Sequence, residues 1–139
     1  MSTPSLVRFG VSIESDLLQK FDRFLEHGGY GTRSEAFRDL IRARLVEERV
    51  QDPDAEAIGV LTLVYNHHQR ELEEKLTDVQ HQAHHHIITT THVHLEHDNC
   101  VEVILLRGKV ATVRALATAL SSFKGVKHSN IALTSVRDI

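Results

Sequence analysis

The sequence predicts an α+β protein of two parts. Three observations carry this prediction. Apolar and polar residues alternate strictly near the start, two stretches with helical spacing of apolar residues follow, and strand-like and helix-like stretches then succeed one another. The polar stretch QDPDAE separates the two parts. We therefore expect one domain at residues 1–50, a linker at 51–56 and a second domain at 57–139.

Residues 6–13, LVRFGVSI, predict a strand with one apolar face. The residues of that face are Val7, Phe9, Val11 and Ile13. A single strand leaves its backbone donors and acceptors unpaired, so it needs another strand beside it. The same strand of a second chain is the most economical partner. We therefore expect a two-stranded antiparallel ribbon between two chains, with Arg8, Gly10 and Ser12 on its open face.

Two helices are expected after this strand. Residues 14–29, ESDLLQKFDRFLEHGG, place apolar residues at helical spacing and end in a glycine pair, a common helix stop. Residues 32–48, TRSEAFRDLIRARLVEE, open with Thr32 and place Glu35 three residues later, which is the pattern of a capping box. The first domain is therefore expected to run strand–helix–helix.

The second domain is expected to have the order β-α-β-β-α-β. Its strands and helices are predicted at 57–68 (strand), 69–80 (helix), 87–96 and 100–108 (strands), 112–123 (helix) and 126–136 (strand). A tight polar turn, His97–Asn99, joins the two middle strands. This order is the split βαβ or ferredoxin-like arrangement.

Composition indicates the compartment. No apolar run approaches the ~20 residues that a membrane helix requires. The first ten residues lack a basic region followed by an apolar core, so no signal peptide is expected. A single cysteine cannot form an internal disulfide, which suits a reducing cytoplasm.

The open face of the ribbon has a size that fits the major groove of double-stranded DNA. Arg8 can bond guanine edges, Ser12 can donate or accept, and Gly10 permits close approach. The start of the second helix, near Arg33 and Ser34, offers N–H groups and charge for a phosphate. Because the net charge is −3, any DNA contact must come from local placement of charge. The alternative is a solvated face of a dimerisation domain.

Histidine is over-represented in one region. Seven of the eleven histidines fall within seventeen residues: His81, His84, His85, His86, His92, His94 and His97. His92 and His94 are two apart on a predicted strand, so both rings project from one face, roughly 7 Å apart. If the turn is His97–Asn99, Glu96 pairs with Cys100 and His94 pairs with Glu102. Strand parity then puts Cys100 on the same face as both histidines.

Two imidazoles and a thiolate on one face suit a divalent transition metal. His81 is a candidate fourth ligand, from the same chain or from a neighbour. The donor types leave Ni(II), Cu(II) and Zn(II) open. For His84, His85 and His86, weak extra metal sites and a solvated loop both remain open.

Longer motifs carry a family resemblance. The segment GYGTRSEAFRDLI resembles ribbon-helix-helix DNA-binding domains. Together with VYNHHQRELEEKLTDVQH and HVHLEHDNC, it makes the chain similar over nearly its full length to the nickel-responsive transcription regulators. The resemblance implies a homotetramer in which two ribbon-helix-helix dimers flank a core of four ACT-like domains. It also implies Ni(II) in planar geometry at the tetramer interface, and repression of nickel-uptake genes.

The resemblance also implies roles for particular residues. The nickel ligands would be His92, His94 and Cys100 of one chain with His81 of the facing chain. Tyr65 and Glu102 match supporting positions near the site. Glu35 and Asp39 match carboxylates that hold a second cation, often K+, between the domains. Arg8, Gly10 and Ser12 match base-reading positions, where members commonly have Thr or Ser in place of Gly10.

The sequence therefore predicts a cytoplasmic nickel-responsive repressor that binds a palindromic operator in double-stranded DNA and is not an enzyme. The main alternative is a metal storage or delivery protein for Ni, Cu or Zn without specific DNA binding. A metalloenzyme is disfavoured, because the sequence shows neither a separate general-base constellation nor a Gly-rich phosphate loop.

Overall fold

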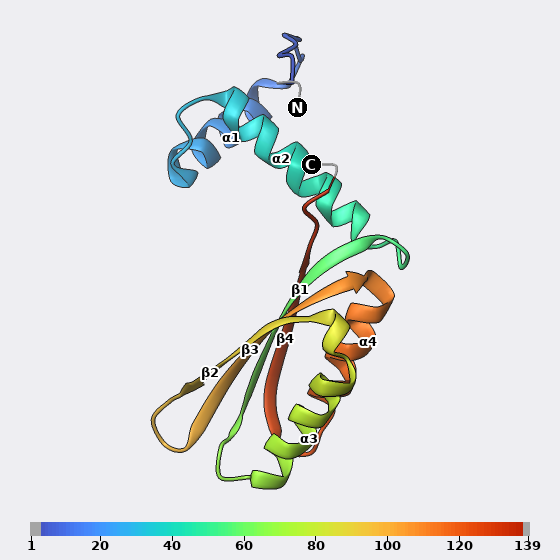
Figure 1. The fold of residues 1–139 in the computed structure, drawn as a ribbon. Coiled ribbons are helices and arrows are strands. Elements are labelled where there is room, and N and C mark those ends of the chain that lie inside the picture. Colours follow the sequence, from blue (N-terminus) through green and yellow to red (C-terminus); the bar gives the residue numbers. More distant parts are fainter. Residues whose placement is uncertain (1–3, 138–139) are drawn as a thin grey trace. The chain divides into compact units, whose positions relative to one another are not determined.

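The computed structural model describes residues 4–137, so the outermost residues of both predicted domains lie outside the described part (Figure 1). Contacts divide the chain into two compact units, Met1–Ile41 and Arg42–Ile139. The second helix, α2, continues through this division. The predicted domain boundary at residue 50 therefore stays a prediction.

The first unit contains α1, Ser15–Gly28, and the start of α2, Arg33–Arg49. Gly29 ends α1 in the left-handed conformation (φ 71°), as a glycine stop predicts. The Oγ1 of Thr32 accepts the backbone N–H of Glu35 at 3.1 Å, which confirms the first bond of the capping box. The Glu35 carboxylate accepts the N–H of Gly31, not that of Thr32, at 3.2 Å.

Residues 4–14 form no regular secondary structure, so the predicted strand at 6–13 is wrong for the single chain. The physical reason is that a lone strand has no ladder partner. Its apolar side chains are exposed accordingly, with 81 % for Val7, 72 % for Phe9 and 55 % for Val11.

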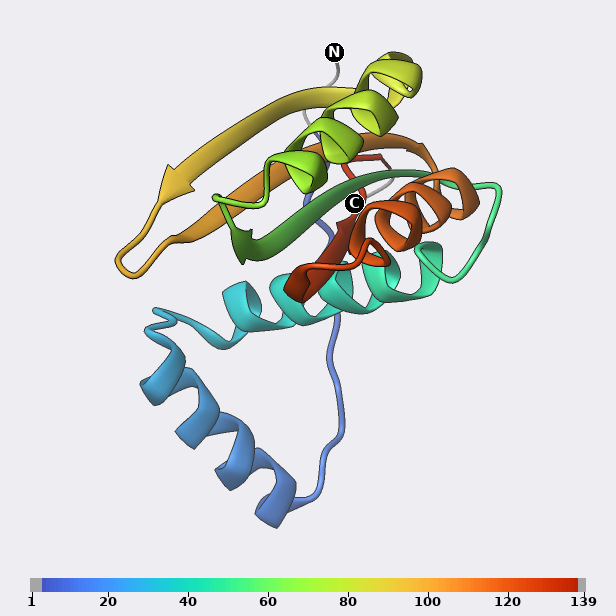
Figure 2. The ribbon, with the colours of Figure 1, turned by 90° about the horizontal axis from the view of Figure 1, so that it is seen from below.

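The second unit has the predicted order of elements. They are β1 (Glu56–Asn66), α3 (Arg70–Gln82), a 3₁₀ turn (His84–His86), β2 (Ile87–His94), β3 (Asn99–Lys109), α4 (Val110–Ser121) and β4 (Val126–Thr134). All neighbouring strands are antiparallel, and their order in the sheet is β2-β3-β1-β4 (Figures 1 and 2). Both β2 and β4 are therefore edge strands, and the predicted β-α-β-β-α-β order is confirmed.

The core of this unit lies between one face of the sheet and both helices, α3 and α4 (Figure 1). Alternate residues of β1 and β3 point into it, as strand periodicity requires. The buried sheet residues are Leu61, Leu63, Tyr65, Cys100, Ile104 and Leu106. Burial falls at the edge strand β2, where most residues are exposed. A row of buried side chains thus meets an exposed edge on the helix-covered face.

We predict that Gly59→Ala lowers the free energy of unfolding by about 1–3 kcal/mol, the usual cost of overpacking a core. A Cβ at Gly59 on β1 would lie 2.5 Å from Cγ1 of Val113 and 3.2 Å from Cδ1 of Ile131. Chemical denaturation measures the change. Gly10→Ala is the matched control, because a Cβ there meets nothing within 4 Å. Equal stability of the two variants would contradict close packing of α4 on β1.

Candidate metal centre

The pairing of β2 with β3 sets the candidate centre. His94 lies opposite Cys100, and His92 lies opposite Glu102. The predicted pairs, Glu96 with Cys100 and His94 with Glu102, are wrong by two residues. Because side chains alternate with period two, a shift of two residues keeps every side chain on its predicted face. The prediction that both histidines share a face with Cys100 therefore survives the wrong register.

The turn is longer than predicted, which explains the error. Leu95–Asp98 connects the strands, and the N–H of Leu95 donates to the carbonyl of Asn99 at 2.7 Å. His97 and Asp98 both have positive φ, 59° and 69°. Asp tolerates this backbone region better than most residues, and His does so to a lesser extent. His97 lies in the turn rather than on the ligand face.

Cys100 and His92 are in contact, with Sγ 3.7 Å from Nδ1. Cys100 is fully buried, whereas the His92 side chain is 44 % exposed. Burial is the largest cause that raises the pKa of the Cys100 thiol. The Tyr65 hydroxyl opposes this rise, and the carboxylates of Glu102 and Glu73 add to it. The thiol therefore keeps its proton at neutral pH until a cation displaces it.

A buried carboxylate supports His92. Glu102 is 1 % exposed, and its Oε2 accepts the Tyr65 hydroxyl at 2.7 Å. Its Oε1 accepts Nε2 of Gln80 at 2.8 Å and lies 3.4 Å from Nε2 of His92. Thr90 on β2 donates to Oε1 of Gln80 at 2.6 Å. A buried charge requires such partners, and they fix the orientation of the ring beside it.

Tyr65 remains a hydrogen-bond donor in this arrangement. Burial, followed by the contact with Glu102, raises its pKa well above the usual range. Its hydroxyl also lies 3.4 Å from Nδ1 of His92. Tyr65 and Glu102, both predicted as supports, thus lie against a predicted ligand.

The other two predicted ligands lie apart from this contact. The His94 ring packs against His67, with centroids 4.8 Å apart. His81 is exposed near the end of α3, directly after Gln80, and its carbonyl accepts Nδ1 of His84 at 3.1 Å. The structure therefore joins His92 to Cys100, keeps His94 beside them in the register, and leaves His81 on the surface. The donor types present, imidazole nitrogen and cysteine sulfur, suit Ni, Cu or Zn.

Sequence reasoning missed a second group of possible ligands. His67, His68 and Asp98 have ligand atoms that all lie within 4.8 Å of one another, a property shared by no other such trio in residues 4–137. The signal that could have found them is the adjacent histidine pair at the end of a predicted strand.

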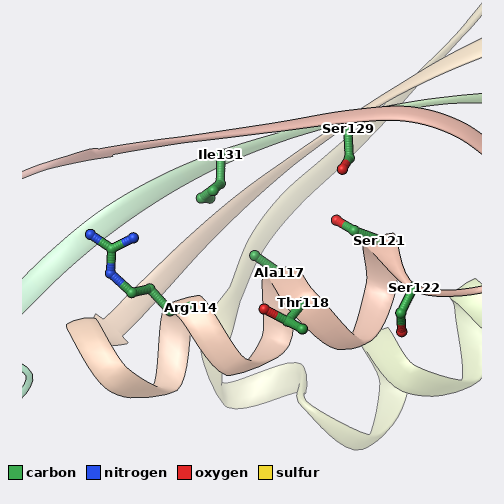
Figure 3. A pocket seen from close by; sticks show the side chains of 7 residues that line it. All are labelled: Arg114, Ala117, Thr118, Ser121, Ser122, Ser129 and Ile131. Atoms are coloured by element: carbon green, nitrogen blue, oxygen red, sulfur yellow. The ribbon is translucent and has the colours of Figure 1, made fainter.

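An open hollow of about 420 Å³ lies elsewhere, between α4 and β4 (Figure 3). Its walls carry Arg114, Ala117, Thr118, Ser121, Ser122, Ser129 and Ile131. The strand β4 is the edge opposite β2. The hollow offers hydroxyls and one guanidinium, so it does not supply metal ligands.

The predicted DNA-contact residues lie in the first unit. Arg8, Gly10 and Ser12 are exposed, and Ser34 is exposed at the start of α2. Arg33 is engaged, because its Nε and Nη2 each donate to the Asp22 carboxylate at 2.9 Å. A phosphate contact through Arg33 would therefore compete with an existing ion pair.

Glu35 and Asp39, predicted to hold a second cation, lie one turn apart on α2 and are both exposed. They share a neighbour, Tyr30. Burial, then the Asp39 carboxylate and then the Glu35 carboxylate raise the pKa of its hydroxyl. The two carboxylates thus face a common region.

Comparison with known proteins decides the family. Residues 58–134 match the family described as the NikR C-terminal nickel-binding domain. The chain belongs to the nickel-responsive regulators. Three similar chains carry the name "putative nickel-responsive regulator". That of Solibacter usitatus is 55 % identical over 94 % of both chains, that of Trichlorobacter lovleyi 52 % over 94 % of both, and that of Nitratidesulfovibrio vulgaris (strain Miyazaki F) 53 % over 93 % of both.

Membership in this family makes Ni(II) the metal and makes the protein a regulator rather than an enzyme. A solved structure of an uncharacterized Thermotoga maritima protein is similar in fold, with a TM-score of 0.52 and 15 % identity. It covers 58 % of this chain and 99 % of its own. Within residues 4–137, no helix is long and apolar enough to cross a membrane.

We predict that Gln80→Ala lowers the unfolding free energy of the metal-free protein by about 1–3 kcal/mol, because it removes a donor from a buried carboxylate. Gln82→Ala is the matched control on the same helix, since Gln82 is exposed and such changes cost little. Chemical denaturation compares them. If Gln80→Ala were as stable as Gln82→Ala, Gln80 would not support Glu102.

We also predict a pH effect in the first unit. The hydrogen bond from Arg33 is the main cause that holds the pKa of Asp22 below its usual range. The ion pair therefore stabilises the folded unit above the unfolded carboxyl pKa of about 4, and this stabilisation is lost as pH falls through the lowered pKa. Arg33→Gln should move the NMR titration midpoint of Asp22 upward. Arg44→Gln, which removes a different exposed ion pair, should not.

Proposed function

We propose that the protein is a cytoplasmic repressor of nickel-uptake genes that binds a palindromic operator as a homotetramer when Ni(II) is present. The ligands are His92, His94 and Cys100 of one chain and His81 of a facing chain. The observation that carries the proposal is the contact of Cys100 with His92 beside a fully hydrogen-bonded buried carboxylate. The family supplies the metal and the regulatory role.

The position of the ligands supports a site shared between chains. His92 and His94 lie on an edge strand and are exposed, although they are on the helix-covered face of the sheet. His81 is exposed on α3. A second chain can therefore approach the three hairpin ligands and present its own His81 to them. The metal would then be reached from two chains at once.

Uncovered apolar surface supports assembly. On the face of the sheet away from α3 and α4, a group of apolar residues is only partly buried: Val60, Val64, Val101, Val103 and Leu105. Val93 on β2 is 45 % exposed. Burial of such surface against another copy is favourable at about 25 cal/mol per Å². A core of several second units gives these residues a partner.

The first unit calls for a partner as well. Phe9 and Val11 are largely exposed, and residues 4–14 lack strand partners within the chain. Pairing with residues 4–14 of a second copy would satisfy the backbone and cover the apolar side chains. Arg8, Gly10 and Ser12 would then face the major groove. Ser34 would serve a phosphate, and Arg33 would do so only after leaving Asp22.

A hydrogen-bonded chain connects the ligands to α3. Thr90 and Glu102 both bind Gln80, which directly precedes His81. Movement of α3 is therefore coupled to the orientation of His92. Nickel, when bound, supplies a cross-link between ligands of two chains and displaces the proton of Cys100.

This cross-link would act by population shift. Without it, the two DNA-binding dimers of a tetramer sample several relative placements. With it, the placement that fits both half-sites of the operator becomes more populated. Coupling of this kind is typically worth about 1–3 kcal/mol, or roughly 5- to 150-fold in affinity. A second cation, K+, at Glu35 and Asp39 would neutralise two carboxylates one turn apart.

Cys100→Ala tests the proposal. We expect the variant to fold but to lose the nickel-dependent gain in operator affinity, since the buried thiol is the one sulfur ligand available. Nickel-dependent footprinting across the nickel-transport promoters of the host locates the operator, and titration on that fragment gives the affinity with and without nickel.

His97→Ala is the control, because His97 is an exposed histidine of the same hairpin that lies in its turn. It should keep the full nickel response. An operator affinity that still rises with nickel in Cys100→Ala would sink the cross-link mechanism. Absence of any specific DNA complex with the unchanged chain would favour metal storage instead.

A further inference from the structure

We propose that His67, His68 and Asp98 form a second site for a divalent transition-metal ion, held within a single chain. The site is separate from the proposed nickel ligands and does not depend on them. Its donors are two imidazoles and one carboxylate, a set that suits borderline ions such as Ni(II) and Zn(II).

Two turns at one end of the sheet bring these residues together (Figure 1). His67 and His68 follow β1, and Asp98 lies in the turn between β2 and β3. The backbone N–H of His67 donates to the carbonyl of Asp98 at 3.0 Å. The N–H of His68 donates to Oδ1 of Asn66 at 2.8 Å. The backbones that carry the three donors are therefore tied to each other and to β1.

The distances are close to those of a metal site. Nε2 of His68 lies 2.9 Å from Oδ1 of Asp98, and all three ligand atoms lie within 4.8 Å of one another. With bond lengths of about 2.0–2.2 Å, two ligands of one ion lie roughly 3–4 Å apart. His68 and Asp98 have exposed side chains, 64 % and 59 %, so rotation can close the remaining gap. A cation would replace the proton that these two side chains share.

His67 supplies a second, independent observation. Its Nδ1 is buried and has no hydrogen-bond partner in the described chain. Buried ring nitrogens in native proteins are usually bonded, and an unbonded one calls for an explanation such as an ion. Its ring also lies 4.2 Å from the His68 ring, centroid to centroid. The site thus contains a polar group that the chain itself does not satisfy.

The site lies one ring contact from a proposed nickel ligand. The opposite side of the relationship is His94, whose ring packs against His67 with centroids 4.8 Å apart. A metal on His67 would therefore restrict the ring against which His94 packs. Yet the three donors belong to two turns of one chain, so loading requires neither Cys100 nor a facing chain.

The test counts and locates bound Ni(II) in the full-length Cys100→Ala protein, in which the other site lacks its sulfur. Calorimetry with Ni(II) alone gives affinity, and elemental analysis gives stoichiometry. We expect about one ion per chain to remain. Adding His68→Ala should weaken its binding at least roughly tenfold. Asp98→Asn should also weaken it while preserving the turn, because Asn tolerates positive φ.

Two matched controls use exposed histidines outside the trio, His97→Ala in the same turn and His85→Ala beyond α3, and both should retain the ion. Paramagnetic broadening by Ni(II) should affect the ring signals of His67 and His68 first. Binding that is unchanged by His68→Ala and by Asp98→Asn, or that is lost equally with His97→Ala, would overturn the proposal. Failure of the nickel regulator mechanism would instead leave the nickel response of the Cys100 variant intact, so the two failures are distinguishable.

Discussion

The candidate centre depends on the pairing of β2 with β3. This register places His94 opposite Cys100 and His92 opposite Glu102, so both rows of side chains share the helix-covered face. A shift of one residue would turn the histidines to the other face. The buried carboxylate of Glu102 then depends on the same register, because its donors come from β1 and α3. Strand pairing, carboxylate and ligand orientation are thus one cooperative arrangement.

The edge position of β2 gives this arrangement its function. Cys100 is buried on the central strand β3, while its histidine partners are exposed on the edge. A thiol in the core is held rigidly, and burial raises its pKa, so it is protonated until a metal competes. Exposed histidines leave room for another chain to complete the coordination. A centre of this kind responds both to metal and to assembly, as a regulator requires.

Sequence alone predicted the order of elements in the second unit and the common face of His92, His94 and Cys100, since both follow from periodicity. It did not predict the register, because the conformation of Leu95–Asp98 is not encoded in alternation. It missed Gln80, whose role depends on a buried partner from another strand. It missed the trio around His67 because two turns distant in sequence meet only in the folded sheet. The predicted strand at 6–13 needs a second chain, which no single-chain pattern supplies.

The central claim is that one nickel ion is held by two chains, and mixed tetramers test it most directly. His81→Ala and Cys100→Ala proteins each lack one ligand in every site. Where the two variants face each other, one site regains His92, His94 and Cys100 from the first chain and His81 from the second. The account predicts that co-expressed mixtures recover tight nickel binding and nickel-dependent operator binding that neither parent shows. Mixtures that assemble yet remain as inactive as both parents would contradict it.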